Sequence, residues 1–188
     1  NDYSVMLKQI GENISKDVKK FVAKVKRFRT MFRQNAPFSY HGPSLEAYKI
    51  IDEQEKALQA IEKEAEGFHD LEELFELSES SYEELVDSRR EIILLKSVWD
   101  MISVINALFE KWSSTLWLDI DTDMLMDETV LLDKQVSGMT REMKNWDVYK
   151  TLYARVKNMA VVIPLISELH SEAMQERHWK TLMTLTHS

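Results

Sequence analysis

The chain contains no cysteine, which excludes disulfide bonds, thiolate metal sites and cysteine nucleophiles. Glycine and proline are also scarce, with 4 and 3 occurrences among 188 residues, so the turn residues that an all-β fold requires are missing. Hydrophobic residues make up 44% of the sequence and charged residues 30%, a balance typical of a folded protein and unlike a disordered one. Together these values predict a helical protein.

An excess of positive charge is absent as well. The formal net charge is −8, which argues against general nucleic-acid binding, because such binding needs a basic face to displace counterions from phosphates. We find no uninterrupted apolar run of about 18 residues, the length a transmembrane helix needs. The longest run, Met159 to Ile166, is interrupted by Pro164. Because Asn1 is neither an initiator methionine nor part of a signal peptide, we expect the chain to be a piece of a longer protein.

The residue spacings in this sequence do not match the known motifs for nucleotide or metal binding. The four glycines are isolated, so neither glycine-rich phosphate-binding pattern occurs. Asp119 to Asp123 imitates the start of a calcium loop, but Met124 and Val130 stand where such a loop needs Gly and Glu. Glu66 and His69 have the Glu-x-x-His spacing of di-iron bundles, which require a second such motif. We therefore predict no catalytic residues, no metal or nucleotide site and no cofactor in this chain.

Apolar residues recur at helical spacing along most of the sequence. The expected helices cover about residues 4–33, 44–77, 81–118, 121–145, 147–163 and 164–169, and the tail 172–185 is also expected to be helical. Ser44 is a predicted N-cap, Ser81 and Glu84 form a predicted capping box, and Asp121 or Thr122 is the predicted cap of the fourth helix. Pro164 is expected in the first turn of the last short helix.

Helices of about 30 residues would be roughly 45 Å long, which is too long for a compact globule of this size. Their apolar faces must bury against one another. We therefore expect an all-α fold, an elongated bundle of long antiparallel helices with spectrin-like packing, divided into residues 1–80 and 81–188. Trp99, Trp112, Trp117, Trp146 and Trp179 are expected to be buried packing anchors, because tryptophan at helical spacing is more often core than ligand platform.

The stretch from Lys16 to Arg33 is basic and amphipathic. It permits two interpretations: its cations face the acidic region Asp52 to Glu84 within the fold, or they bind an external partner. The candidate partner-binding residues are Lys19, Lys20, Lys24, Arg27, Arg29 and Arg33.

Four features in the second half resemble the tail-to-linker region of dynein heavy chains. They are the Trp helices around Trp99 and Trp112, the turn at Trp146 and Tyr149, the Val161–Ile166 segment with Pro164, and the Arg177-His178-Trp179 triplet. The resemblance covers about residues 85–183. Phe28–Phe32, Ala36–Phe38 and Tyr48–Asp52 look more like axonemal heavy chains than cytoplasmic ones. Arg177, His178 and Trp179 either fasten this segment to its neighbour or simply pack at a helix end.

The resemblance implies a mechanical role. In that family this region joins the tail to a linker that swings across an ATP-hydrolysing AAA+ ring, and microtubule binding occurs further along the chain. It implies other dynein heavy, intermediate or light chains as partners, no nucleic acid, no membrane, and a location in the cytoplasm and cytoskeleton, in a ciliary or flagellar axoneme. The alternative function is that of a stand-alone spectrin-like adaptor that binds a protein partner through residues 16–33.

Overall fold

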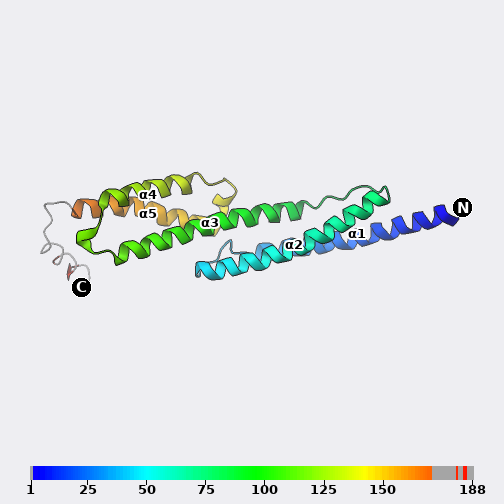
Figure 1. Ribbon diagram of the computed structural model, residues 1–188, viewed down its shortest axis with the longest axis horizontal. Coiled ribbons are helices and arrows are strands. Elements are labelled where there is room, and N and C mark those ends of the chain that lie inside the picture. The colour runs from blue at the N-terminus through cyan, green and yellow to red at the C-terminus, as the bar shows by residue number, and fades with distance from the viewer. Residues whose placement is uncertain (1, 171–180, 182–183, 186–188) are drawn as a thin grey trace. The chain divides into compact units, whose positions relative to one another are not determined.

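A computed structural model describes residues 2–170, 181 and 184–185 of the chain. The described elements are α1 (Asp2–Asn35), α2 (Ser44–Leu74), α3 (Glu83–Ser114), α4 (Thr122–Ser137) and α5 (Asp147–Leu169), with short 3-10 turns η1 (Trp117–Asp119) and η2 (Met143–Asn145) (Figure 1). No strand occurs in these residues, which confirms the all-α prediction. The chain divides into two compact units, residues 1–99 and 100–188. This division falls inside α3, whereas the boundary expected from the sequence, after residue 80, precedes that helix.

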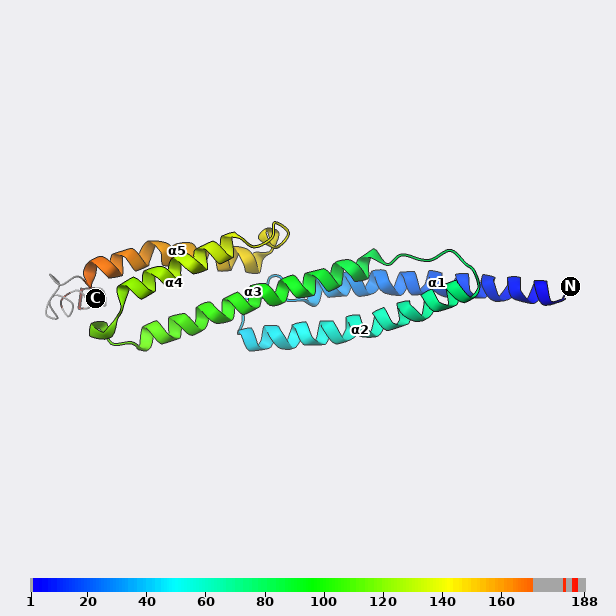
Figure 2. The same cartoon turned by 45° about the horizontal axis from the view of Figure 1, so that its top comes forward.

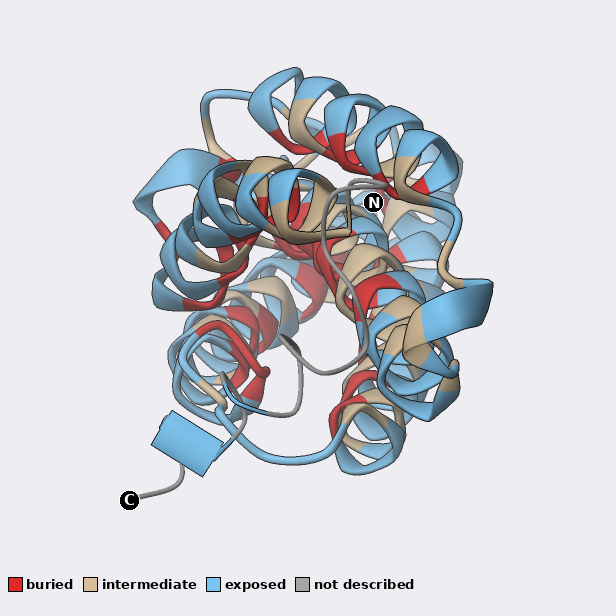
Figure 3. Ribbon diagram, turned by 90° about the vertical axis from the view of Figure 1, so that its left-hand side faces the viewer, coloured by how far each residue is buried: buried red, intermediate tan, exposed pale blue. Residues whose placement is uncertain are grey.

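In the first unit α1 and α2 run antiparallel, and the first part of α3 returns alongside them (Figures 1 and 2). Each helix has a buried stripe and an exposed stripe, as Figure 3 shows by colour. Buried positions recur every three to four residues or at multiples of that spacing, as expected for amphipathic helices. The largest fully buried side chains of this unit are Val25, Phe32, Ile51, Leu58, Ile92, Leu95, Val98 and Trp99.

The two loops of the first unit are held by specific contacts. In the α1–α2 loop, Phe38 is buried and its ring meets that of Phe32 edge to face at 5.9 Å. In the α2–α3 loop, the buried Glu72 carboxylate accepts hydrogen bonds from the Ser80 backbone N–H at 2.9 Å and from its hydroxyl at 2.5 Å. Glu76 adopts a positive φ of 52°, and α2 therefore ends at Leu74, slightly before the predicted end.

In the second unit α4 packs antiparallel to α5 (Figures 1 and 2). The interface buries Leu125, Leu132 and Val136 of α4 and Leu152, Val156, Met159 and Ile163 of α5. The last part of α3 is tied to α5 by Arg155, which donates to Asn106 Oδ1 at 2.9 Å and lies 5.3 Å from the centre of the Phe109 ring. The Asp121 side chain accepts from the Met124 backbone N–H at 3.0 Å, so the predicted cap of α4 is confirmed.

Several predicted helix boundaries are wrong. Ser44 is the first residue of α2 and Pro43 holds the N-cap position, without a side-chain cap. α3 begins at Glu83, two residues after Ser81. α4 ends at Ser137, because Gly138 forms its C-cap and the chain then turns through η2.

Pro164 does not begin a sixth helix but lies inside α5, which continues from Asp147 to Leu169. A proline inside a helix removes one backbone N–H donor, and its ring clashes with the carbonyl four residues earlier. The buried residues Met159 and Ile163 pack the preceding turns of α5 in the core of this unit, and we attribute the continuity of the helix to that packing.

α3 is the one helix among the described residues that has the length and composition of a membrane-spanning segment. The expectation that no such apolar stretch exists was therefore too strict, because Lys96 and Asp100 are the only charges between Ile92 and Phe109. Core helices of soluble proteins share this composition. Ile92, Leu95, Val98 and Trp99 are buried against protein, and 28% of the apolar window is buried.

Candidate functional site

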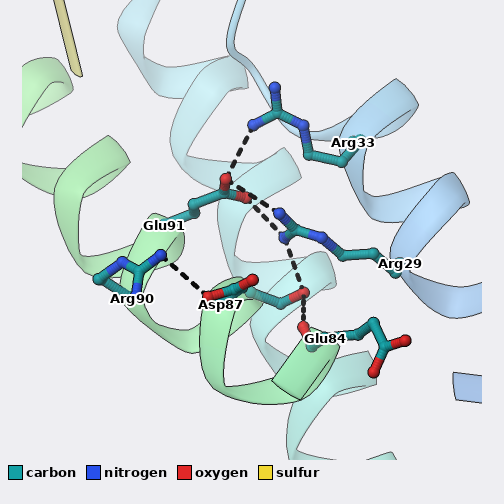
Figure 4. A network of polar contacts seen from close by, with 7 residues as sticks. Arg29, Arg33, Glu84, Asp87, Arg90 and Glu91 are labelled. Atoms are coloured by element: carbon teal, nitrogen blue, oxygen red, sulfur yellow. Dashed lines mark hydrogen bonds and ion pairs between the residues drawn. The ribbon is translucent and has the colours of Figure 1, made fainter. Parts of the chain in front are cut away.

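Glu91 of α3 is a buried charge of the first unit, with a side chain that is 7% exposed. Two guanidinium groups of α1 converge on it, as Figure 4 shows. Arg29 binds both carboxylate oxygens, at 2.7 and 3.1 Å, and also donates to the Ser88 hydroxyl at 3.1 Å. Arg33 donates to the same carboxylate at 3.0 Å. We call Arg29, Arg33, Ser88 and Glu91 the α1–α3 ion cluster.

The planar guanidinium suits this arrangement, because its parallel N–H groups match the two oxygens of a carboxylate. Both arginines also contact aromatic rings. Arg33 lies 4.2 Å from the centre of the Phe38 ring, and Arg29 lies 5.8 Å from that of Phe32. The cluster therefore couples charge pairing between α1 and α3 to the packing of the α1–α2 loop.

A second ion cluster joins α2 to α3. Arg89 binds Glu62 at 2.6 Å and Glu55 at 3.2 Å, and Lys96 also pairs with Glu55. The hydrogen bond from Lys96 holds the pKa of Glu55 below its ordinary value of 4.5, with Coulomb attraction to Lys96 and Arg89 acting in the same direction and burial opposing it. The pKa of Arg89 is raised, chiefly by its hydrogen bond to Glu62. The carboxylate of Glu55 is thus stabilised in its charged form.

The basic part of α1 makes internal ion pairs through some of its predicted partner-binding residues. Lys24 pairs with Glu64 of α2 at 2.5 Å, while Arg29 and Arg33 pair with Glu91. Glu64 lies in the acidic region expected from the sequence, and Glu91 lies just beyond it.

The other predicted partner-binding residues are exposed. Lys20 has only a distant contact of 4.0 Å with Asp17, and Lys19 and Arg27 have no ion pair with any described residue. Each interpretation therefore applies to half of the six predicted residues. Three of these cations pair with acidic residues inside the fold, and the other three remain accessible to a partner.

Trp99 is 2% exposed and anchors α3 to the α1–α2 loop. Its indole N–H donates to the Pro37 carbonyl at 3.2 Å, and its ring centre lies 5.9 Å from that of Tyr40. A buried indole usually finds such a partner. Trp99 thus has the surroundings expected of a packing anchor.

Trp146 and Tyr149 occupy the entry to α5, and both are buried. The Tyr149 hydroxyl donates to the Val136 carbonyl in the last turn of α4 at 2.9 Å, and burial raises the pKa of this hydroxyl. The bond satisfies one of the carbonyls that a helix end leaves open. This pair therefore fixes the turn between α4 and α5.

Trp112 and Trp117 are only half-buried, so the expectation of a buried packing anchor is wrong for these two residues. They lie near the end of α3 and in η1, where fewer neighbouring helices cover them than in the middle of a bundle. Trp112 meets Phe109 edge to face at 5.8 Å, and Trp117 meets His170 edge to face at 5.0 Å. Trp179, with Arg177 and His178, lies outside the described residues.

The sequence reasoning missed Glu91, Arg89 and Glu55, which carry the two ion clusters. The only signal available was a charge on the apolar face of a helix: Glu91 directly precedes the buried Ile92 and follows the buried Ser88 by three residues. Among the described residues, no group of His, Asp or Glu side chains is arranged to hold a metal ion. The arrangement fastens helices together by packing and ion pairing.

Comparison with known proteins identifies the same region as the sequence motifs did. A family model described as dynein heavy chain, N-terminal region 2, matches residues 85–188. The chain is 36% identical over 88% of its length to dynein axonemal heavy chain 17 of Homo sapiens. It is 35% identical over 88% to the dynein beta chain, flagellar outer arm, of Chlamydomonas reinhardtii, and 31% identical over 94% to the alpha chain of that arm.

The chain spans about 4% of the length of each of these relatives. Their names are those of axonemal and flagellar proteins, which confirms the axonemal assignment and the cytoskeletal location expected from the sequence. The family match begins at Leu85, where the resemblance seen in the sequence also begins. The chain therefore belongs to the axonemal dynein heavy chains, as a segment of their N-terminal region.

Proposed function

We propose that this segment is a non-catalytic mechanical link that joins the tail to the linker of a microtubule motor and transmits force from an AAA+ ring. The proposal rests on the position of the boundary between the two compact units in the sequence. The division after Trp99 falls inside α3, so the backbone passes from one unit to the next as helix. Flexible domain connections instead run through exposed segments rich in Gly and Pro.

The helical connection is supported on its first-unit side by buried contacts. Trp99 is the last residue of the first unit and is held by the Pro37 carbonyl. Glu91, two turns earlier in α3, is held by Arg29 and Arg33 of α1. A load applied along α3 would therefore be shared with α1 and its loop.

The test is to interrupt α3 in the full-length heavy chain. Insertion of three glycines between Trp99 and Asp100 should leave ATP hydrolysis measurable and lower microtubule gliding velocity at least about threefold, because glycine weakens the helix by roughly 1 kcal/mol per residue relative to alanine. The matched control is the same insertion after Gly42, in the exposed loop between α1 and α2. Equal velocities for the two insertions would contradict force transmission through α3.

The proposal also assigns no nucleotide site to this segment, with ATP bound elsewhere in the heavy chain. Equilibrium dialysis of the 188-residue chain against labelled ATP and Mg²⁺ should show no binding at micromolar concentration. Saturable binding with one nucleotide per chain would refute this part of the proposal.

The expected partners are other dynein heavy, intermediate or light chains, and microtubules through the rest of the heavy chain. The accessible cations of α1, Lys19, Lys20 and Arg27, favour contact with an acidic partner. Lys19→Glu with Arg27→Glu should reduce the amount of other dynein subunits recovered with the heavy chain. The control Lys150→Glu, which changes an exposed lysine on α5, should not. Identical subunit recovery from both variants would exclude this surface as the contact.

A further inference from the structure

The apolar stripe of α1 that packs in the first unit continues past the end of the packing. Ile14 and Phe21 of this stripe are buried, whereas Leu7 is 41% exposed and Tyr3 is 76% exposed. Figures 1 and 2 show that α1 extends beyond the loop that joins α2 to α3. Residues 2–9 are accordingly exposed on every side of the helix. Because helices in proteins gain most of their stability by packing an apolar face, this end of α1 presents a face that a partner can cover.

A groove runs along this exposed end. It lies between residues 3–19 of α1 and residues 74–77 at the end of α2, and its volume is about 1040 Å³. Leu7 and Phe75 contribute apolar walls. Gly11 lies below Leu77, and a Cβ atom at Gly11 would be 3.6 Å from that side chain. A long groove with apolar walls beside an exposed helix suits the binding of another helix, which anchors apolar side chains at helical spacing.

One side of the groove carries a row of lysines. Lys8 and Lys19 line the groove, and Lys26 follows further along α1. Lys19 and Lys26 come 11 and 18 residues after Lys8, which is about three and five whole helical turns, so the three lysines stand in one line about 27 Å long. We call Lys8, Lys19 and Lys26 the lysine row.

The lysine row differs from the cations of α1 that pair within the fold, such as Lys24 with Glu64. All three of its side chains are exposed, and none has an ion pair with any described residue.

The charge beside the groove is positive in an otherwise acidic chain. Lys16 lines the groove together with Lys8 and Lys19, and the acidic residues on its walls are Glu12 and Glu76. Three cations thus stand against two carboxylates, while the whole chain has a net charge of −8. Complementary charge favours a partner with acidic residues beside its apolar ones.

We propose that the groove and the lysine row bind an amphipathic helix of another dynein subunit. The apolar residues of that helix lie in the groove, and its Asp and Glu side chains pair with the lysine row. A row of about 27 Å corresponds to a partner helix of about 18 residues. A second copy of this chain is a poorer occupant, because a symmetric contact sets the same surface against itself and would bring two lysine rows together. The inference rests on the acidic partner proposed above and gives it a binding site and a helical structure.

Cross-linking of the intact dynein assembly with a zero-length carbodiimide, which joins a lysine amine to a carboxylate, tests this contact. Mass spectrometry should find a residue of the lysine row linked to an Asp or Glu of another subunit, in a peptide whose apolar residues recur at helical spacing. The internal Lys24–Glu64 pair, at 2.5 Å, is the positive control for the reaction. With that control present, the proposal is overturned by links only to a second copy of this chain, only to the heavy chain itself, or to no partner.

Leu7→Gln tests the groove, with Val5→Gln as its matched control. Leu7 lines the groove, whereas Val5 is absent from its walls and lies two positions away, about 200° around the helix. Both side chains are exposed, so neither substitution removes a core contact. Leu7→Gln should lower the yield of the cross-link from Lys19 at least about fivefold, because it removes an apolar anchor, and Val5→Gln should leave that yield unchanged. Equal yields from the two variants would show that the partner does not lie in the groove.

Subunit recovery with the heavy chain separates this inference from the proposed acidic contact. The inference requires that both Leu7→Gln and the pair Lys19→Glu with Arg27→Glu lower recovery. An effect of the charge reversals alone would keep the acidic contact and exclude the groove. An effect of Leu7→Gln alone would exclude the acidic helix, and no effect of either would refute both proposals.

Discussion

The α1–α3 ion cluster gives the sharpest stability prediction, through Glu91→Gln. The substitution keeps the size of the side chain but removes its charge, and it places an amide N–H₂ donor where a guanidinium needs an acceptor. Three charge-assisted hydrogen bonds at 2.7, 3.1 and 3.0 Å converge on the carboxylate of Glu91. All three are weakened or lost.

The size of the expected loss of stability depends on how exposed the two arginine side chains are. Removing one partner of a buried ion pair costs about 3–5 kcal/mol, because the other charge stays buried without compensation. Here the Arg29 side chain is 21% exposed and cannot fully rehydrate, whereas Arg33 is 43% exposed and can turn toward water. We therefore expect a loss of about 3 kcal/mol, at the lower end of that range, and a fall in melting temperature of about 6–12 °C for a chain of this size.

Hydrogen exchange of α1 amides is the appropriate assay, since it reads the first unit separately from the second. A loss of about 3 kcal/mol should speed exchange near Phe32 by about 100-fold. The control is Asp87→Asn, which removes an exposed pair with Arg90 on the same helix and should cost no more than about 1 kcal/mol. Equal exchange in the two variants would refute the view that Glu91 is a buried structural charge.

Three further substitutions test other contacts. Trp99→Ala should cost about 3–5 kcal/mol in urea unfolding and Trp112→Ala clearly less, because only the first side chain is fully buried; similar losses would contradict this assignment. Glu55→Gln should destabilise the chain at pH 7, and the difference should shrink as the pH falls below 4.5: the folded-state pKa of Glu55 is lowered, so its stabilisation is present above the unfolded-state pKa and is lost as pH falls through the folded-state value. A pH-independent difference in melting temperature would count against that ion pair. Pro164→Ala should raise the melting temperature of the chain, because alanine restores a backbone N–H inside α5 and costs less in a helix; a lower melting temperature would mean that the proline ring contributes packing.

The helices themselves could be predicted from the sequence because their signals are local. Apolar residues such as Phe21, Val25 and Phe32 repeat along one helix face, and the capping role of Asp121 depends only on the residues that follow it. The same local reasoning failed at Pro164. There the packing of α5 against α4, which no local rule contains, outweighs the preference of proline for a helix start.

The ion clusters could not be predicted, because charge on a helix surface says nothing about which distant residue faces it. Arg29 and Glu91 are separated by 62 positions, and the chain offers 24 basic and 32 acidic residues as alternatives. Trp112 was misjudged for a related reason. Its helical spacing matches that of Trp99, but burial depends on how many neighbouring helices continue alongside that turn of α3.

The two ion clusters help to fix the register of the long helices, which apolar packing alone specifies weakly. The buried faces of α1, α2 and α3 are built mainly from apolar side chains, so a slip of one helix along another by two turns would replace one set of apolar contacts with another. Glu91 meets both Arg29 and Arg33 in a single register, and Glu55 meets Arg89 and Lys96 in a single register. A slip would leave Glu91 buried without a partner, which is far more costly than exchanging one aliphatic contact for another. A buried polar residue fixes the register of coiled coils by the same physics. For a segment proposed to carry load along its helices, resistance to sliding matters more than total stability, and the α1–α3 ion cluster provides that resistance in the first unit.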